Sequence, residues 1–408
     1  MRFIDLFAGC GGLSLGLSQA GWKGVFAIEK NEDAFKTFSH NFNGKKTLRF
    51  DWPKWLPKQA ISTSELLDDY RAELVALRGG VDLIAGGPPC QGFSFAGRRR
   101  ADDPRNKLKD EYLEIVDIIR PKFLVFENVK GFTAKFKGSA KSTHSEQVIK
   151  QLEGLDWGGY HTFSDVLDAS IFGVPQPRPR FILIAVRSDL LSQQVEVSNP
   201  LKHINEHASD FRKRKRLNGH DISVKEAISD LEISSAGTRD SVDTKGFQQI
   251  VYQRETTTDF QRLMKEGLPL GQSANSLRLA RHRPETLSKF QEILATCPKG
   301  KSLPKGFREK YNIKKQCFTP LHPDELSKTV TTLPDDLLHY SEPRILTVRE
   351  CARLQTFPDW FEFLGKYTTG GVRRKQECPR YTQVGNAVPP LMAEALGQKI
   401  IEMAKTYG

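Results

Sequence analysis

The chain has 408 residues, of which 38% are hydrophobic and 27% charged, a balance typical of a folded protein of two or three domains rather than a disordered or fibrous chain. Lys and Arg exceed Asp and Glu by 61 to 49, and the net charge of +12 favours a polyanionic partner. No apolar run approaches the roughly 20 residues of a membrane span. The six cysteines form no CxxC pair of the kind that binds structural zinc. The composition therefore predicts a cytoplasmic protein without a membrane segment or a metal site.

The N-terminal segment has the pattern of a nucleotide-binding βαβ unit. An apolar strand over residues 3–7 leads into the glycine-rich segment Ala8–Gly12, a helix follows, and the next strand ends in Glu29. Glycines let the backbone approach a ligand, and the acid can bind ribose hydroxyls. Ser14 stands where the dinucleotide fingerprint has its third glycine, so we expect a different adenosine-bearing cofactor. Residues 50–52 are expected to close a further strand.

A stiff turn follows the next predicted strand, over residues 81–85. The strand ends in Gly-Gly-Pro-Pro and delivers Cys90 to its carboxyl end, where open α/β sheets bind ligands. Pro88 and Pro89 fix φ and remove backbone donors. A lone cysteine is more often a small buried hydrophobe, so both a catalytic and a structural interpretation of Cys90 remain open here. Residues 98–109 are basic and interrupted by proline, which predicts an exposed loop.

The following α/β unit repeats this arrangement. A helix over residues 112–119 precedes an apolar strand over residues 123–126, which ends in Glu127. Cys90 and Glu127 are therefore expected at equivalent ends of adjacent strands. A glutamate directly after four apolar residues is rarely a simple surface residue. It can carry a proton for catalysis, or it can be a buried carboxylate paired with an arginine.

The remaining chain contains a proline-framed pair of arginines and a region of different character. In the segment Gln-Pro-Arg-Pro-Arg, Arg178 and Arg180 point the same way if the backbone is extended, which suits anchoring of a substrate oxygen or phosphate. Residues 187 to about 316 are more polar and weakly periodic, and predict a separate domain or large insertion. After a capping box at Thr347, residues 383–390 indicate a turn. A last helix with one apolar face is expected to return to the first domain.

Six motifs in order and spacing resemble the DNA (cytosine-5)-methyltransferase family. They are FAGCGGLSLG (7–16), Glu29, GGPPCQGFS (86–94), ENVKGF (127–132), QPRPR (176–180) and QVGNAVPP (383–390). The resemblance implies an α/β, Rossmann-like S-adenosylmethionine-dependent methyltransferase fold, with a mixed, largely parallel sheet covered by helices on both faces. It also implies a catalytic, cofactor-binding domain of residues 1–186 plus about 340–408, and a smaller target-recognition domain of about 187–339.

The family's chemistry implies roles for the predicted catalytic residues. A thiolate that attacks C6 of cytosine makes an enamine whose C5 can accept a methyl group. By resemblance Cys90 is this nucleophile, and Glu127 binds N3 and the exocyclic amine. Arg178 resembles the arginine that holds O2 of the base and supports the nucleophile, with Arg180 as its neighbour. Because the target carbon lies inside a duplex, the base must be flipped out.

The resemblance also implies S-adenosylmethionine as the methyl donor, with contacts spread over several motifs. The implied cofactor-binding residues are Phe7, Gly9, Gly12, Glu29 on the ribose, Asp51 on the adenine amine, Pro89, and Asn386 at the methionine end. One departure lies at Lys30, where many family members carry an aromatic residue that stacks on adenine. Trp52 is a candidate replacement for that stacking.

Duplex DNA with a specific cytosine-containing site is the implied partner. The segment from Ser94 to Lys109 resembles the family's loop that closes over DNA, and its arginines would contact phosphates. The implied DNA-binding residues are Gln91, Ser94, Arg98, Arg99 and Arg100. A chain without a regulatory extension is expected to be a prokaryotic or phage modification enzyme. We expect it to act as a monomer, with a cognate restriction endonuclease as its genetic partner.

Three other functions remain as alternatives. The first is a tRNA cytosine-5 methyltransferase of the same family, which the long region after residue 187 disfavours because a duplex reader needs that surface. The second is a catalytically inactive DNA-binding homologue, which the presence of Cys90, Glu127 and Arg178 disfavours. The third is a nicotinamide oxidoreductase, which Ser14 and the Pro-Pro-Cys-Gln turn disfavour.

Overall fold

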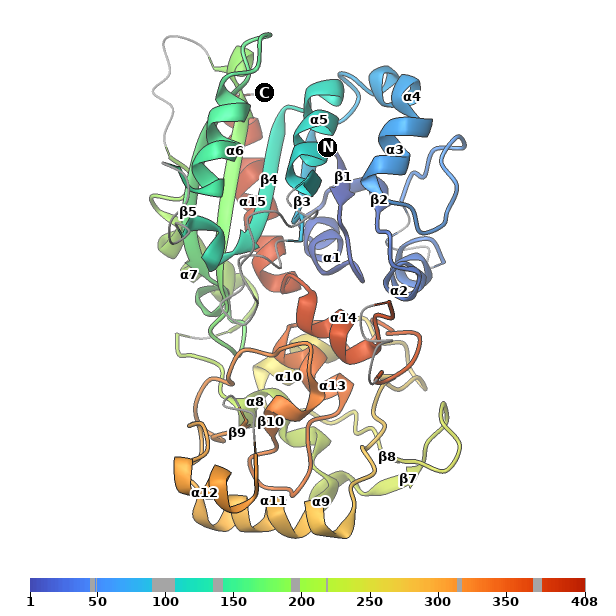
Figure 1. The fold of residues 1–408 in the computed structure, drawn as a ribbon, viewed down its shortest axis with the longest axis vertical. Helices are drawn as coiled ribbons and strands as arrows, with labels where there is room; N and C mark the ends of the chain where they lie inside the picture. The colour runs from blue at the N-terminus through green and yellow to red at the C-terminus, as the bar shows by residue number, and fades with distance from the viewer. Residues whose placement is uncertain are drawn as a thin grey trace. The chain divides into compact units, whose positions relative to one another are not determined.

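The chain divides into two compact units in a computed structural model (Figure 1). The structure describes residues 1–44, 48, 50–89, 107–134, 142–191, 199–217, 219–313, 318–369 and 376–407. Unit 1 comprises Met1–Ala169, Pro179–Ala208 and Met392–Gly408, and unit 2 comprises Ser170–Arg178 and Ser209–Leu391. These bounds describe packed units of the chain, whereas the predicted catalytic and target-recognition domains are divisions by function. The bounds of the two predicted domains therefore stay predictions.

Unit 1 is built on a sheet of six strands in the order β2-β1-β3-β4-β6-β5. The strands are β1 (Arg2–Leu6), β2 (Lys23–Ile28), β3 (Leu83–Gly86), β4 (Phe123–Val129), β5 (Tyr160–Asp168) and β6 (Pro179–Arg187). Strands β1 to β4 are parallel to one another, and β6 runs antiparallel to both β4 and β5. This arrangement confirms the predicted mixed, largely parallel sheet.

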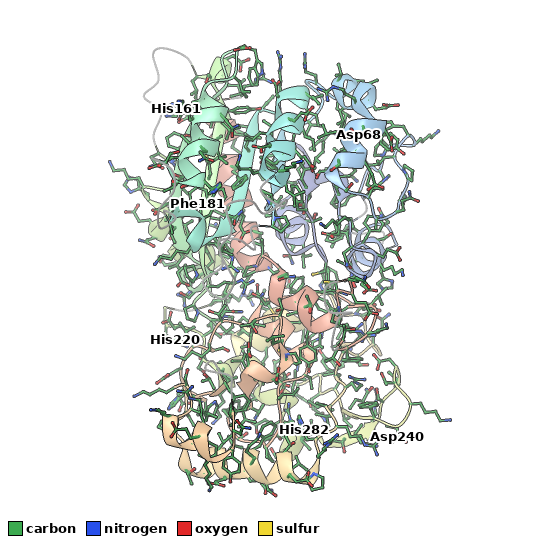
Figure 2. The ribbon with its side chains drawn as sticks, in the orientation of Figure 1. Asp68, His161, Phe181, His220, Asp240 and His282 are labelled. Atoms are coloured by element: carbon green, nitrogen blue, oxygen red, sulfur yellow. The ribbon has the colours of Figure 1, made fainter. Side chains whose placement is uncertain are left out.

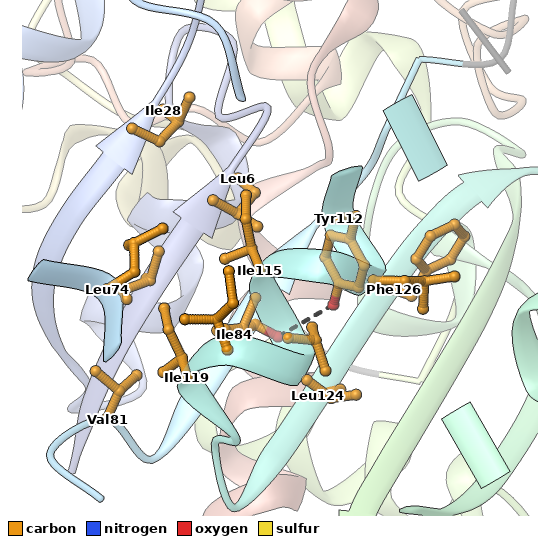
Figure 3. Close-up of a cluster of buried hydrophobic side chains, with 14 of the residues drawn as sticks. Leu6, Ile28, Leu74, Val81, Ile84, Tyr112, Ile115, Ile119, Leu124 and Phe126 are labelled. Carbon is orange, nitrogen blue, oxygen red and sulfur yellow. Dashed lines mark hydrogen bonds between the residues drawn. The ribbon is translucent and has the colours of Figure 1, made fainter. Parts of the chain in front are cut away.

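Helices cover the sheet because each presents an apolar stripe to it. Those of unit 1 are α1 (Gly12–Gln19), α2 (Glu32–Phe42), α3 (Thr63–Asp69), α4 (Arg71–Ala76), α5 (Lys107–Ile119), α6 (His144–Glu153) and most of α15 (Pro390–Tyr407). Under α5, Tyr112 and Ile115 pack with Ile84 and Phe126 in one buried cluster (Figure 3). Phe181 on β6 points into the same core, whereas His161 on β5 is exposed (Figure 2).

The last helix returns to unit 1, as predicted. Trp22 Nε1 donates a hydrogen bond to Gly397 O at 3.0 Å. A Cβ on Gly397 would lie only 2.9 Å from Ala20 Cβ, so α1 and α15 are in close contact. The apolar side chains of α15, Met392, Leu396 and Ile400 among them, are buried. This contact ties the C-terminus to the glycine-rich unit at the start of the chain.

Unit 2 consists of short helices, two small sheets and much irregular chain. Its helices, with α7 crossing from unit 1, are α7 (Ile204–Arg214), α8 (Val224–Ile228), α9 (Ile233–Ala236), α10 (Asp259–Lys265), α11 (Pro284–Thr296), α12 (Lys305–Lys310), α13 (Val348–Leu354) and α14 (Arg380–Asn386). Its strands are β7 (Thr238–Asp240), β8 (Gln248–Ile250), β9 (Thr319–Pro320) and β10 (Leu337–Leu338). Unit 2 also contains buried ion pairs. Arg353 donates to Asp230 at 3.0 Å and to Asp359 at 2.7 Å.

Two local predictions are wrong, and one is confirmed. Residues 50–52 are irregular chain, although Asp51 N donates to Gly24 O beside β2. Residues 383–386 belong to α14 rather than to a turn. Gly385 is needed there because its Cβ would lie 2.2 Å from Thr331 O, a close backbone approach that only glycine permits. The capping box at Thr347 begins α13 as predicted.

Candidate cofactor-binding and catalytic site

The glycine-rich loop after β1 has backbone conformations that its sequence makes possible. Phe7, Gly9 and Gly11 have φ of 62°, 57° and 102°. A Cβ on Gly11 would lie 2.4 Å from the Phe42 ring, whereas one on Gly9 would meet nothing within 4 Å. The loop is therefore packed on α2 at Gly11 and open above Gly9. Helix α1 begins directly after the loop, at Gly12. The N–H groups of its first turn are a favourable place for a polar ligand.

A buried carboxylate beneath this loop was missed by the sequence interpretation. Asp5, in β1, accepts a hydrogen bond from Ser14 Oγ at 2.6 Å. Gly11 at the N-cap of α1 makes no side-chain bond, so Asp5 serves the first turn of α1 from the strand. Burial raises the pKa of the Asp5 carboxyl to about 7. An acid within an otherwise apolar strand, directly before a glycine loop, was the available signal.

Glu29 lies on the other side of the loop, at the end of β2. Its Oε2 accepts from Gly9 N at 2.9 Å, and its Oε1 accepts from Asn31 N at 2.7 Å. Burial raises the pKa of this carboxyl as well. The structure thus brings Phe7, Gly9, Gly12 and Glu29 together, as the nucleotide-binding pattern predicts. The two carboxylate oxygens together offer about four lone-pair sites, so Glu29 can still accept from ribose hydroxyls.

Asp51 and Trp52 lie after α2, in the same unit. The Asp51 side chain is about half exposed and lies 3.4 Å from Lys23 Nζ. Trp52 Nε1 donates to Leu56 O at 2.8 Å, and its ring makes edge contacts with Phe26 and Phe35. These contacts make Trp52 a packing residue, whereas Asp51 presents a carboxylate to solvent.

The second part of the site lies where β3 ends at Gly86 and the neighbouring β4 continues to Val129. Gly86 pairs with Phe126 in parallel register, so Gly87 comes beside Glu127. A Cβ on Gly87 would lie 2.7 Å from Glu127 Oε2. Asn128 Nδ2 donates to Pro88 O at 3.0 Å and holds the turn against β4. Glu127 therefore lies beside the end of β3 but within β4 rather than at its end, and the predicted position of Cys90 lies outside the described residues.

Several predicted site residues follow directly in the chain and lie outside the described residues. Pro89 is exposed and is the last described residue of this turn. The predicted nucleophile and DNA-binding residues beyond it are Cys90, Gln91, Ser94, Arg98, Arg99 and Arg100. Their roles stay predictions.

Glu127 is paired with Arg180. Arg180 Nε lies 2.8 Å from Glu127 Oε1, and the two side chains are only 13% and 12% exposed. The pair forms because β6 runs antiparallel to β4 with Val129 opposite Arg180. The guanidinium holds the Glu127 carboxyl group in a fixed orientation although both side chains are largely removed from solvent. This pairing matches the second interpretation made from the sequence, a buried carboxylate paired with an arginine, and the proton-carrying role of Glu127 stays a prediction.

Arg178 makes a different set of contacts within unit 2. Its Nη1 donates to Val330 O at 3.0 Å, and its Nη2 donates to Gly385 O at 2.6 Å and Ala387 O at 3.1 Å. The guanidinium is buried. The residue between the last two carbonyls is Asn386, the exposed last residue of α14. The structure therefore associates Arg178 with the predicted cofactor residue Asn386.

Among the described residues, no group of three or more His, Cys, Asp or Glu side chains could hold a metal ion. Within the same residues, no helix is both long and apolar enough to cross a membrane.

The family model for C-5 cytosine-specific DNA methylases matches residues 1–402. This chain belongs to that family. It is 32% identical to the Type II methyltransferase M.DdeI of Desulfomicrobium norvegicum, over 98% of this chain and 88% of the relative. It is also 32% identical to the Type II methyltransferase M.XorII of Xanthomonas oryzae pv. oryzae, over 98% of this chain and 84% of that protein.

The same fold occurs in an E. coli prophage protein described as a DNA modification methyltransferase. Its crystal structure aligns with a TM-score of 0.64 and 23% identity, over 99% of both chains. Together with the sheet order, this likeness confirms the predicted Rossmann-like methyltransferase fold. The family match confirms the prediction of a DNA (cytosine-5)-methyltransferase, and membership implies methyl transfer that depends on S-adenosylmethionine.

Proposed function

We propose that this protein methylates C5 of a flipped cytosine, at a specific site in duplex DNA, through a covalent adduct with Cys90. The observation that carries the proposal is the Glu127–Arg180 pair beside Gly87, three residues before that cysteine. A largely desolvated carboxyl group held by a guanidinium suits recognition of a cytosine edge, because one oxygen can accept from the exocyclic amine and the protonated group can donate to the ring nitrogen N3.

The proposed chemistry uses the residues at the end of β3 and beside it in β4. The Cys90 thiolate adds to C6, and the electron pair of the C5–C6 bond becomes available at C5. Glu127 accepts from the exocyclic amine with one oxygen and, in its protonated form, donates to N3 with the other, so that N3 is hydrogen-bonded where negative charge develops as sulfur adds. S-adenosylmethionine supplies the methyl group. Loss of the C5 proton and elimination of the thiolate then restore the aromatic ring and free Cys90.

The contacts favour a different division of labour between the two arginines than the resemblance implied. Arg180 is bonded to Glu127, whereas the Arg178 guanidinium is occupied by backbone carbonyls. We therefore assign to Arg180, and not to Arg178, the support of Glu127 and the contact with O2 of the base. A guanidinium suits this double task because its fixed fork can serve two acceptors at once.

For the cofactor, we propose that the open backbone at Gly9 and the start of α1 approach the methionine part and that Glu29 binds the ribose. Phe7, Gly12, Asp51, Pro89 and Asn386 complete the proposed cofactor contacts. The open glycine loop and the Glu29 carboxyl group beside it fit a ligand with hydroxyl groups. Gln91, Ser94, Arg98, Arg99 and Arg100 are the proposed DNA contacts.

Covalent trapping on duplex DNA that contains 5-fluorocytosine tests the proposal. We expect an adduct that depends on S-adenosylmethionine for the native enzyme and for Cys378→Ser, a control at another thiol. Cys90→Ser should form none and should show no turnover, yet still bind DNA and cofactor. Full activity of Cys90→Ser would refute the proposed nucleophile. Glu127→Gln is expected to slow adduct formation by about a hundredfold.

The substrate and the biological setting are proposed on the names of the relatives. Both relatives are Type II methyltransferases, which supports duplex DNA as the substrate and a restriction-modification setting. We propose that the enzyme acts as a cytoplasmic monomer with a cognate endonuclease as its genetic partner. Methyl transfer to tRNA and none to duplex DNA would instead favour the RNA-directed alternative. Bisulfite sequencing of DNA from cells that express the protein would identify the methylated site.

A further inference from the structure

Arg178 links the segment 175–178 to the end of α14 through hydrogen bonds to backbone carbonyls. Its side chain is 2% exposed and donates to the carbonyls of Val330, Gly385 and Ala387. The carbonyls of Gly385 and Ala387 lie immediately before and after Asn386. One guanidinium thus fixes the backbone on both sides of a single exposed residue.

The end of a helix is a favourable place for such a cation. The last carbonyls of a helix lack intrahelical partners and carry the negative end of the helix dipole. Arg178 neutralises them from a buried position, where charged hydrogen bonds are stronger than in water. Asn386 is therefore presented on a backbone that cannot turn without breaking these bonds.

Neighbouring residues reinforce the same backbone. Gln355 Nε2 donates to Val384 O at 2.7 Å and to Ala387 O at 3.3 Å. Gln176 receives the N–H of Val330 at 2.8 Å and donates to Leu354 O at 2.7 Å. The close approach of Gly385 to Thr331 leaves no room for α14 to shift toward that chain. The bonds of Arg178 thus belong to a larger hydrogen-bonded scaffold. Among the residues described here, Asn386 has the only exposed polar side chain at this end of α14.

We propose that Arg178 is a positioning residue that acts on the cofactor through Asn386. The inference rests on the proposed contact of Asn386 with the methionine end of S-adenosylmethionine. Lysine keeps the charge but cannot reach three carbonyls with one ammonium group in the geometry of a guanidinium. Arg178→Lys should therefore let Asn386 move, while the Glu127–Arg180 pair in unit 1 keeps its own contacts.

Titration of the whole enzyme with S-adenosylmethionine in the absence of DNA tests this inference. Arg178→Lys is expected to raise Kd about tenfold, the value of one ordinary hydrogen bond. Asn386→Ala should do the same. In the double variant the two increases in Kd should not multiply, because both substitutions remove the same contact between Asn386 and the cofactor.

Arg349→Lys is the matched control, since Arg349 is also buried in unit 2. It donates to the carbonyls of Asn275, Pro358 and Phe361. We expect this variant to lower thermal stability as Arg178→Lys does, but to leave Kd unchanged. An equal rise of Kd in the control, an unchanged Kd in Arg178→Lys, or a hundredfold rise in the double variant would each overturn the inference. An unchanged Kd in Asn386→Ala would instead refute the proposed cofactor contact itself.

Discussion

Replacement of Asp5 by asparagine should remove a large pH dependence from the stability of unit 1. Asp5 is buried in β1, and its Oδ1 has no hydrogen-bond partner among the described residues. Burial raises the pKa of this carboxyl from its ordinary 3.8 to about 7 in the folded protein. The folded state therefore binds a proton that the unfolded chain releases. Stability is fully retained below pH 3.8 and is lost as the pH rises through about 7.

The magnitude follows from the difference between the two pKa values. About three units correspond to ~4 kcal/mol in total, of which ~3 kcal/mol falls between pH 5 and pH 8. Asp5→Asn has no titration at this position, so its stability relative to the native chain should rise by that amount over the same range. Its oxygen can still accept from Ser14, and any unpaired amide proton adds an offset that does not vary with pH.

Urea unfolding followed by tryptophan fluorescence at pH 5, 6, 7 and 8 measures this difference. The signal reports mainly on unit 1, which contains four of the five tryptophans: Trp22, Trp52, Trp55 and Trp157. Asp51→Asn, at a half-exposed carboxylate of the same unit, is the control and should parallel the native chain. If Asp5→Asn also parallels the native chain from pH 5 to pH 8, the assigned proton on Asp5 is wrong.

Two further predictions concern Glu127 and the DNA contacts. Gly87→Ala places a Cβ 2.7 Å from Glu127 Oε2 and should lower the methylation rate by about tenfold or more at unchanged cofactor affinity. Gly80→Ala, whose Cβ would meet no atom closer than 3.4 Å, is its control, and equal rates in the two variants would contradict the role of Glu127. Glutamine at Arg98, Arg99 and Arg100 should reduce the slope of log affinity against log salt by up to about three for duplex DNA. An unchanged slope would show that these arginines do not contact phosphates.

The order of strands and helices could be predicted from the sequence because their signals are local. Apolar runs that end in glycine, as at Ala8–Gly12 and after residue 85, set the strands and the loops at their carboxyl ends. The acid at Glu29 follows from the same short patterns, whereas the strand predicted to end at Glu127 continues to Val129. Of the turn predicted at residues 383–390, residues 383–386 belong to α14, and the close backbone approach of Gly385 to Thr331 arises only from a segment distant in the chain.

The partners of the charged side chains were decided only by the tertiary structure. Sequence alone places Arg178 and Arg180 on the same face of an extended segment, and the resemblance assigned the contact with the base to Arg178. The register between β4 and β6 brings Arg180 to Glu127, and Arg178 instead meets carbonyls more than 150 positions away in the chain. The partners of a buried guanidinium depend on which backbone carbonyls remain without hydrogen bonds after folding. The guanidinium must donate to these carbonyls because its own N–H groups are removed from water. Composition and motif spacing do not indicate which acceptors these two arginines meet.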